Sequence, residues 1–364
     1  MRRSIVGCYR SLLACLVLSP LCTAALAGAA ENECQASGGN QYICGPQSAE
    51  DLVLVPDTAF IISSGYGAGS PFYLIDAKGK SWSELQPAVS SAGLNTGPFG
   101  ACPVAPDFQK MVTHGLNIRQ GKDGHSTLYV VGHGAREAIE VFDVNANGDR
   151  PLLTWKGCIV MPQGLVANSV ASFADGSLLA TVPLYPGKTL TDAMAGESTG
   201  AVYAWSPGDA GFTLVQGTEL PYANGIEVSD DGQEFYVASS GVFTVGAYTR
   251  SNPSRLLRTS RPMEIVPDNL HRGPDGQLLT AGLVLEHADC GTIGGSQEFN
   301  LEEFAACPRP FIVKAVDPQT MTIRNVASGP ANADFSNVTM ALPVAQELWI
   351  GTFAGNRIAY RALE

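Results

Sequence analysis

The chain has 364 residues, a formal net charge of −12 and only 15% charged residues. Such an acidic chain is a poor partner for nucleic acid or for an anionic membrane surface, so we expect neither. Its 40 Gly and 23 Pro indicate a turn-rich β protein, and its length suits one large all-β domain.

The N-terminal segment predicts a cleaved leader. A basic start is followed by an apolar core over residues 11–22 and by a small-residue cleavage site at 25–27. We therefore expect a signal peptide over 1–27, a mature domain over 28–364, and a secreted or periplasmic protein. The apolar core is too short to span a bilayer stably, and no later apolar stretch is long enough for a membrane helix.

A local pattern then recurs six times along the chain. A polar residue precedes a turn, and the turn opens a short apolar strand. The polar residues are Glu50, His114, Asn168, Asn224, Asn269 (with Asp268 beside it) and Asn337. The strands span 59–64, 127–132, 177–182, 234–239, 277–282 and 347–352. Intervals of roughly 45–70 residues are typical of propellers. The pattern predicts an all-β, six-bladed β-propeller with four-stranded antiparallel blades around a central tunnel.

If every blade presents this position to the tunnel, the polar side chains converge at one end of it. Carboxylate and amide oxygens are ligands of hard cations, and Ca²⁺ takes about six to eight oxygens. Zinc is disfavoured because it prefers His and Cys. A single Asn before a turn can be a turn former only. Similar spacing from Asn168, Asn224 and Asn269 to their Asp-Gly turns favours a shared site instead.

Two stretches outside the repeat, 190–195 and 299–306, predict short helices in inserted loops. The loops 65–72, 183–200 and 283–310 carry no legible motif. We expect them to select the substrate, with 283–310 shaping the mouth of the site.

Six cysteines follow the leader: Cys34, Cys44, Cys102, Cys158, Cys290 and Cys307. An even number in an exported chain predicts disulfides, and fifteen connectivities are possible. The simplest hypothesis is local pairing, Cys34–Cys44 and Cys290–Cys307. Cys102–Cys158 would then join neighbouring blades.

Several segments together resemble the serum paraoxonase/arylesterase family. They are 50–65, 114–116, 130–142, 221–238, 266–282 and 347–353. The resemblance covers most of the mature chain. The ANGI segment (223–226) and the PDN segment (267–269) are shared, more loosely, with gluconolactonase-like and strictosidine-synthase-like propellers.

The resemblance implies a six-bladed propeller that hydrolyses lactones and aryl esters with calcium in its tunnel. At the matching positions it implies a catalytic Ca²⁺ held by Glu50, Asn168, Asn224, Asp268 and Asn269. It implies that His114 and His133 form the general-base pair. Ser169 stands where the family has an acidic residue, which leaves a second, structural ion near Asp51 and Leu116 in doubt.

These residues support one hypothesis about the chemistry. Water attacks the carbonyl of a small-molecule lactone or activated ester, His114 acts as the base, and the ion acts as a Lewis acid. His133 would orient His114 or relay its proton. A competing interpretation is that His114 only packs in the channel, while His133 hydrogen-bonds a backbone carbonyl. No GxSxG, HExxH or phosphate-loop motif occurs.

Two further alternatives differ in class. The chain could be a non-catalytic propeller binding protein with a structural calcium, or a lyase or isomerase on the same scaffold. Among the remaining polar residues, His125 and His271 sit in turn sequences and are expected to face solvent. Asn337 is expected to line the pocket without binding metal. Neither the natural substrate nor the oligomeric state can be read from the sequence.

Overall fold

The computed structural model describes residues 34–67, 69, 72–89, 98–99, 102–295 and 298–363. These residues belong to one compact unit that begins at Cys34. The predicted leader, 1–27, lies outside them, so cleavage and export stay predictions. No helix in the described part of the chain is long and apolar enough to cross a membrane.

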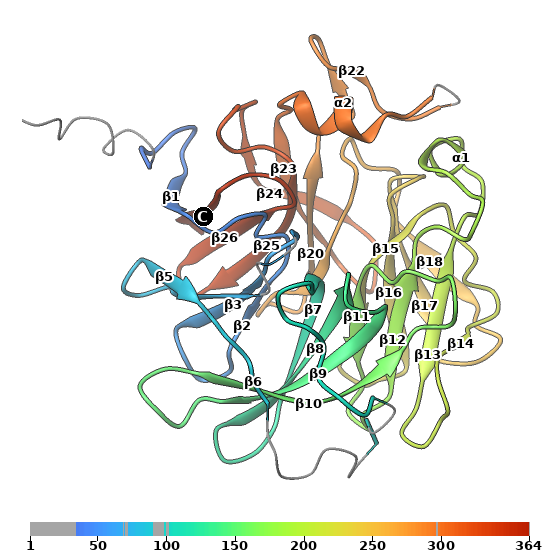
Figure 1. Cartoon of the computed structure of the whole chain (residues 1–364). Coiled ribbons are helices and arrows are strands. Elements are labelled where there is room, and N and C mark those ends of the chain that lie inside the picture. Colours follow the sequence, from blue (N-terminus) through green and yellow to red (C-terminus); the bar gives the residue numbers. More distant parts are fainter. Residues whose placement is uncertain are drawn as a thin grey trace, which may run out of the picture. The chain divides into compact units, whose positions relative to one another are not determined.

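Six antiparallel sheets follow one another along the chain, which confirms the predicted propeller with four-stranded blades (Figure 1). In the first five blades the strands pair outward in chain order. The sixth blade is completed by a strand from the beginning of the described chain, β1, which pairs with the C-terminal strand β27. This pairing joins the two ends of the domain in one sheet.

The strands fall into four sets. The innermost are β2 (Leu52–Leu54), β7 (Val112–Gln120), β11 (Val170–Ser172), β15 (Ala223–Val228), β19 (Leu270–Arg272) and β25 (Val338–Val344). The second are β3 (Phe60–Ser64), β8 (His125–His133), β12 (Leu178–Val182), β16 (Glu234–Ser239), β20 (Leu278–Leu283) and β26 (Glu347–Thr352). The third are β4 (Phe72–Asp76), β9 (Ala138–Asn145), β13 (Ala201–Trp205), β17 (Thr244–Thr249), β23 (Phe311–Val316) and β27 (Arg357–Ala362). The outer are β5 (Ser81–Glu84), β10 (Leu152–Val160), β14 (Thr213–Leu214), β18 (Leu256–Thr259), β24 (Ile323–Gly329) and β1 (Gln41–Cys44).

The apolar strands predicted from the repeat are the second strands of the six blades. Each blade has a neighbour on both faces, so a second strand is buried on both sides and reads as a continuous apolar run. All five residues of β12 are buried in this way. Six apolar clusters fill the spaces between adjacent blades.

The turns that open the second strands share one chemistry. In three blades the Asp of the Asp-Gly turn accepts a hydrogen bond from the backbone N–H two residues later. The distances are 3.0 Å for Asp175, 3.0 Å for Asp231 and 3.1 Å for Asp275. The following Gly has a positive φ, which a residue without Cβ adopts at little cost. The repeated Asp-Gly signal therefore has a structural cause in each of these blades.

Additional elements decorate the blades. The short strand β6 (Ala88–Val89) pairs in parallel with β10. The two predicted helices are confirmed as α1 (Leu190–Met194) and α2 (Leu301–Ala306). The hairpin β21–β22 (Glu286–His287 and Gly291–Thr292) precedes α2, and we call the described residues 284–295 and 298–310 the cap. Figure 1 shows β22 and α2 together at one end of the sheets.

All three predicted disulfides are present: Cys34–Cys44, Cys102–Cys158 and Cys290–Cys307. The expectation that Cys102–Cys158 joins neighbouring blades is wrong. Cys158 lies on β10, and Cys102 lies in the segment that leads into β7 of the same sheet. This bridge therefore holds a connecting segment against the outer part of one blade.

Candidate active site and metal site

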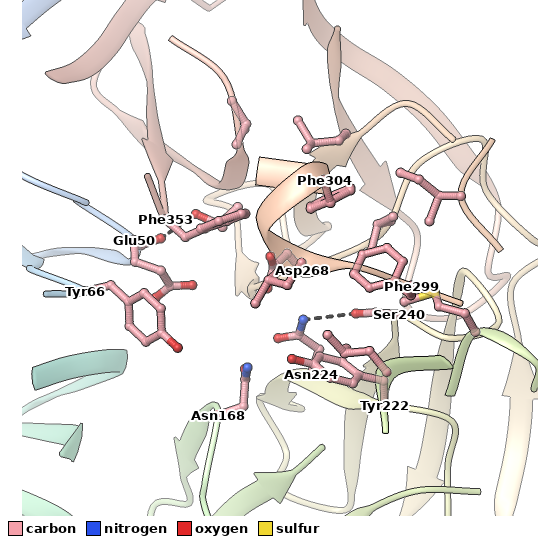
Figure 2. A pocket seen from close by; sticks show the side chains of 18 of the residues that line it. Glu50, Tyr66, Asn168, Tyr222, Asn224, Ser240, Asp268, Phe299, Phe304 and Phe353 are labelled. Carbon is pink, nitrogen blue, oxygen red and sulfur yellow. Dashed lines mark hydrogen bonds between the residues drawn. The ribbon is translucent and has the colours of Figure 1, made fainter. Parts of the chain in front are cut away.

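A pocket at one end of the propeller brings together polar residues from five different blades (Figure 2). It is lined by Glu50, His114, Asn168, Asn224 and Asp268. Asn269 contacts the same group, because its Nδ2 donates to Glu50 Oε1 at 2.6 Å. Side chains that are far apart in the sequence thus meet at the innermost strands.

Two glycines allow the blades to approach one another so closely. The ladders of β7 and β15 are interrupted by a bulge, and each bulge contains a site residue followed by Gly, His114-Gly115 and Asn224-Gly225. A Cβ at Gly115 would lie 2.6 Å from the Asn168 carbonyl oxygen, and one at Gly225 would lie 2.4 Å from that of Asp268. Bulges re-aim side chains at the rims of sheets. Here they set each site residue against the next blade's site residue.

We expect Gly225→Ala to destabilise the fold by about 1–3 kcal/mol, because the added methyl group must push the Asp268 backbone away. The same displacement should weaken binding of any cation at the site. Chemical unfolding and calcium titration would measure the two effects. Gly211→Ala is the matched control, since a Cβ there meets nothing within 4 Å. Equal stability of the two variants would contradict this account of blade packing.

Four of the five predicted metal ligands carry a buried oxygen that lacks a hydrogen-bond partner. These are Glu50 Oε2 and the Oδ1 atoms of Asn168, Asn224 and Asn269. An unsatisfied buried polar atom costs about 1–3 kcal/mol, so four together call for a ligand. Asn224 Nδ2 donates to Ser240 Oγ at 3.0 Å, which leaves Oδ1 for such a ligand (Figure 2). Asn168 turns its amide nitrogen to the pocket in Figure 2, and a half-turn of the amide would present Oδ1.

The carboxylates at the site repel one another in a buried setting. Burial, followed by the charges of Asp51 and Asp268, raises the pKa of Glu50 well above its ordinary value. Burial also raises the pKa of Asp268. A divalent cation would remove this repulsion, and carboxylate with amide oxygens is the donor set that Ca²⁺ prefers. Within the described ranges no three His, Cys, Asp or Glu side chains form a metal-binding group, and the predicted ligand set combines carboxylates with amide oxygens.

Protein donors already contact Asp51, the residue implied for the second ion that the sequence left in doubt. Its Oδ1 accepts hydrogen bonds from Leu52 N at 2.8 Å and from His271 Nε2 at 2.6 Å, and its Oδ2 accepts one from Leu116 N at 2.7 Å. Each oxygen therefore already accepts at least one hydrogen bond from the protein. Although burial alone would lower it, the Asp51 carboxylate raises the pKa of His271. A protonated His271 would supply beside Asp51 the positive charge that a second cation would bring.

The expectation that His271 faces solvent is therefore wrong, because its side chain is only 13% exposed. His271 lies on β19, two residues after Asn269. Alternate residues of a strand face the same side, so this spacing was the available signal. His125 does lie near the surface, 44% exposed, and pairs with Asp143.

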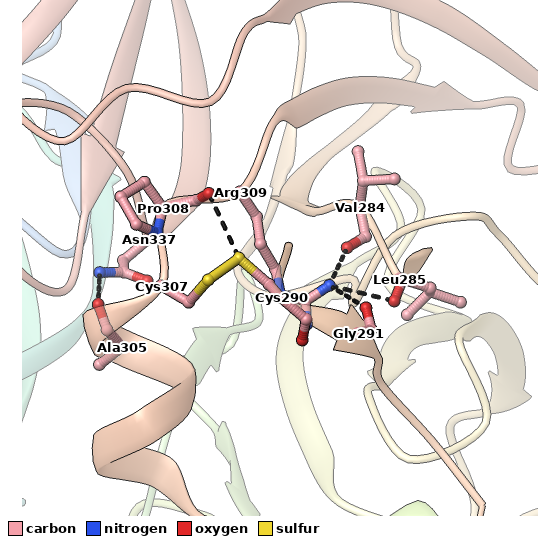
Figure 3. The surroundings of a disulfide bond; sticks show 9 residues. All are labelled: Val284, Leu285, Cys290, Gly291, Ala305, Cys307, Pro308, Arg309 and Asn337. Carbon is pink, nitrogen blue, oxygen red and sulfur yellow. Dashed lines mark hydrogen bonds between the residues drawn. A yellow bond between two sulfur atoms is a disulfide. The ribbon is translucent and has the colours of Figure 1, made fainter. Parts of the chain in front are cut away.

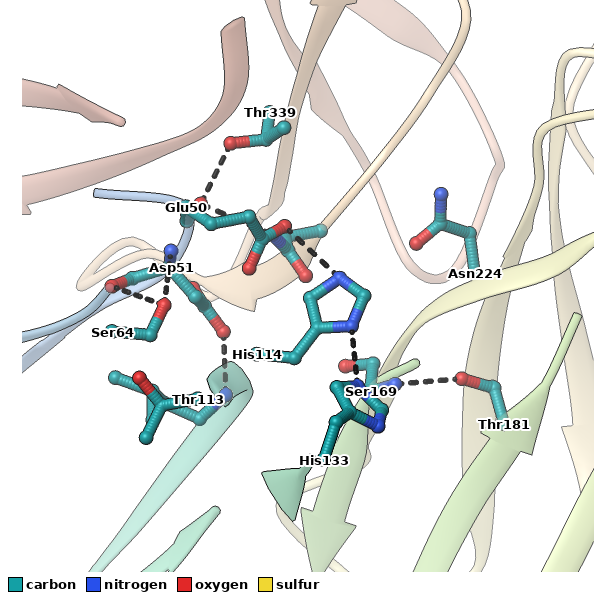
Figure 4. A network of polar contacts seen from close by, with 12 residues as sticks. Glu50, Asp51, Ser64, Thr113, His114, His133, Ser169, Thr181, Asn224 and Thr339 are labelled. Carbon is teal, nitrogen blue, oxygen red and sulfur yellow. Dashed lines mark hydrogen bonds and ion pairs between the residues drawn. The ribbon is translucent and has the colours of Figure 1, made fainter. Parts of the chain in front are cut away.

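The two predicted base residues are in direct contact (Figure 4). His114 Nδ1 lies 3.2 Å from His133 Nε2, and His114 Nε2 lies 3.7 Å from Glu50 Oε1. Burial, and to a smaller extent His133, lower the pKa of His114 well below its ordinary value. A neutral His114 can accept a proton. The alternative that His133 bonds a backbone carbonyl is wrong, because its Nδ1 contacts Glu137 Oε2 at 2.6 Å.

The polar residues Glu50, His114, Asn168, Asn224 and Asp268 form what we call the polar floor of the pocket. Most of the remaining lining, the pocket wall, is apolar. Its members are Tyr66, Leu190, Met194, Tyr222, Val266, Leu283, Ile293, Phe299, Leu301, Phe304, Val338 and Phe353. The three loops predicted to select substrate all contribute, although part of 65–72 lies outside the described residues. The aromatic wall residues themselves were not predicted, since no motif marks them. The ring centroids of Tyr66 and His114 are 4.4 Å apart.

The cap is fastened over this wall by polar contacts and a disulfide (Figure 3). The Cys290–Cys307 bridge joins the hairpin to the end of α2. The buried Arg309 guanidinium donates to backbone carbonyls of Val284, Leu285, Cys290 and Gly291. Asn337 Nδ2 donates to Ala305 O at 3.0 Å. Asn337 therefore supports α2 and does not line the pocket, contrary to the prediction.

Comparisons with known proteins agree with this architecture. Residues 112–285 match the family model described as the SMP-30/gluconolactonase/LRE-like region. Over this segment the chain is similar to that family, and the paraoxonase resemblance stays a prediction. No curated protein matches the sequence.

Three solved structures show the same fold. A luciferin-regenerating enzyme is 14% identical with a TM-score of 0.53, covering 90% of this chain and 96% of its own. A gluconolactonase from Xanthomonas campestris is 14% identical with a TM-score of 0.52, covering 90% and 91%. The calcium-binding protein regucalcin from Agrobacterium tumefaciens is 9% identical with a TM-score of 0.50, covering 89% and 94%. At these identities the likeness shows the fold alone.

Proposed function

We propose that this protein is a calcium-dependent hydrolase of lactones or activated esters. The observation that carries the proposal is the set of buried oxygens without partners, set beside the neutral His114. Glu50, Asn168, Asn224, Asp268 and Asn269 would hold the ion. The family match and the names of the similar structures, a gluconolactonase and a calcium-binding protein among them, support the same chemistry.

In the proposed mechanism the chain's own residues position the substrate and move the proton. When bound, calcium would polarise the substrate carbonyl and stabilise the developing negative charge. His114 Nε2 accepts the proton of the attacking water, since its low pKa leaves it unprotonated. His133 holds His114 through the Nδ1 contact. The apolar wall binds the rest of the substrate and excludes bulk water.

The wall also indicates which lactones or esters to test first. Phe299, Phe304 and Phe353 face the polar floor in Figure 2 and offer no hydrogen-bonding groups. A sugar lactone would lose its hydroxyl hydration there without replacement, which is costly. We therefore propose that the preferred substrates carry an alkyl or aryl group.

Removal of calcium should abolish turnover and lower the thermal stability of the protein. A ligand present at 100 times its Kd stabilises the folded state by about 2.7 kcal/mol, so the melting temperature should rise when calcium is restored. The measurement is hydrolysis of alkyl lactones, aryl esters and sugar lactones, before and after chelation. Full activity in chelator would refute the proposal. Calcium binding without turnover on any substrate would favour a non-catalytic binding protein.

A further inference from the structure

A third side chain, that of Glu137, contacts His133 through the ring nitrogen that does not face His114. His114 contacts His133 at 3.2 Å, and His133 Nδ1 contacts Glu137 Oε2 at 2.6 Å. Glu137 is four residues after His133, beyond a tight turn in which Gly134 has a φ of +77°. A Cβ on Gly134 would lie 2.2 Å from the Lys110 carbonyl oxygen, so the turn requires glycine. The turn places the Glu137 carboxylate in contact with the His133 imidazole.

The neighbouring cation bonds another residue and does not compete with His133 for the Glu137 carboxylate. Arg136, the adjacent cation, donates through Nε to Glu140 Oε1 at 2.6 Å. The Glu137 backbone is held as well, because its carbonyl accepts from Met161 N at 3.0 Å. The His133 ring is only 13% exposed, whereas Glu137 is 37% exposed. Of the three side chains in contact, the Glu137 carboxylate therefore lies nearest the surface, and His114 lies at the pocket.

These contacts determine which nitrogen carries each proton. An ionised carboxylate only accepts hydrogen bonds, so His133 must carry its proton on Nδ1. When the His133 ring is neutral, its Nε2 is then an acceptor, and His114 donates to it through Nδ1. The remaining nitrogen, His114 Nε2, has a free lone pair and faces Glu50 Oε1 at 3.7 Å. That is the tautomer a general base at the pocket needs.

We propose that Glu137 is a positioning residue that fixes the tautomers of both histidines and so directs the His114 Nε2 lone pair to the substrate. The inference rests on the proposed hydrolase function. Orienting partners of this kind are worth about 10- to 100-fold in activity. Glu137→Gln keeps the shape but can either accept or donate, so it no longer forces one tautomer. We expect kcat to fall by that factor with KM nearly unchanged.

The chain offers a matched control for this substitution. His125 lies on the same strand, β8, at its other end, and its Nδ1 contacts the Asp143 carboxylate at 3.0 Å. Asp143→Asn removes the charge from the same kind of pair away from the pocket. It should leave kcat unchanged and alter only His125.

The test combines kinetics with ¹⁵N spectra of the imidazole rings at a pH where they are neutral. The chain has only five histidines, so each ring can be assigned. We expect Glu137→Gln to mix the tautomers of His133 and His114. Unchanged tautomers, or changed tautomers with wild-type kcat, would overturn the role of Glu137. Failure of the wild-type protein to hydrolyse any substrate would instead refute the hydrolase proposal, while the spectra would still test the tautomers.

Discussion

Asp268→Asn should lower kcat/KM by about 10²- to 10³-fold, because it removes one of the two carboxylates that would hold the ion and stabilise charge near it. The amide has nearly the same size, so the pocket keeps its shape. Calcium titration and steady-state hydrolysis would measure the two losses. Asp275→Asn is the matched control, since Asp275 lies in the same blade on an exposed turn.

Asp268→Asn should also change the thermal stability of the protein, in opposite directions with and without calcium. Without a cation, Asp268 and Glu50 are like charges in a buried site, and each carboxyl has a raised pKa. A group with a raised pKa destabilises the fold when it must be ionised at neutral pH. Asp268→Asn should therefore melt higher than wild type in chelator and lower than wild type in calcium. A variant that is less stable in both conditions would contradict the proposed site.

His114→Gln should lower kcat by about 10²- to 10⁴-fold, the usual contribution of a positioned general base. Calcium affinity should stay close to that of wild type, because His114 is not one of the proposed ligands. His125→Gln is a control on the strand β8 at the far end from the site. Measurement of kcat and of calcium binding on the same samples separates the two roles. Wild-type turnover in His114→Gln would remove His114 as the base and leave the metal site untouched.

The propeller could be predicted from the sequence because the same local signal recurs in every blade. An Asp-Gly turn followed by an apolar run becomes a turn and a second strand in several blades, such as those containing Asp175 and Asp231. The convergence of Glu50 and Asn224 follows from the same repetition. Once the number of blades is known, equivalent positions must meet at the tunnel.

The parts of the site that were missed depend on contacts between segments without a shared motif. His271 was assigned to a turn because its strand is only three residues long. Glu137 approaches His133 only through the particular backbone of the turn at Gly134. Asn337 bonds α2 of the cap, and the cap belongs to no repeated unit of the sequence. Each of these contacts is set by local backbone geometry or by insertion packing, which residue spacing does not reveal.

The central claim is that oxygens from four blades share one cation, and a crystal grown with calcium tests it most directly. We predict a single anomalous peak within about 2.3–2.6 Å of carboxylate oxygens of Glu50 and Asp268 and of the Asn224 amide oxygen. No peak at this position in calcium-saturated crystals, with the same oxygens still lacking partners, would contradict the account.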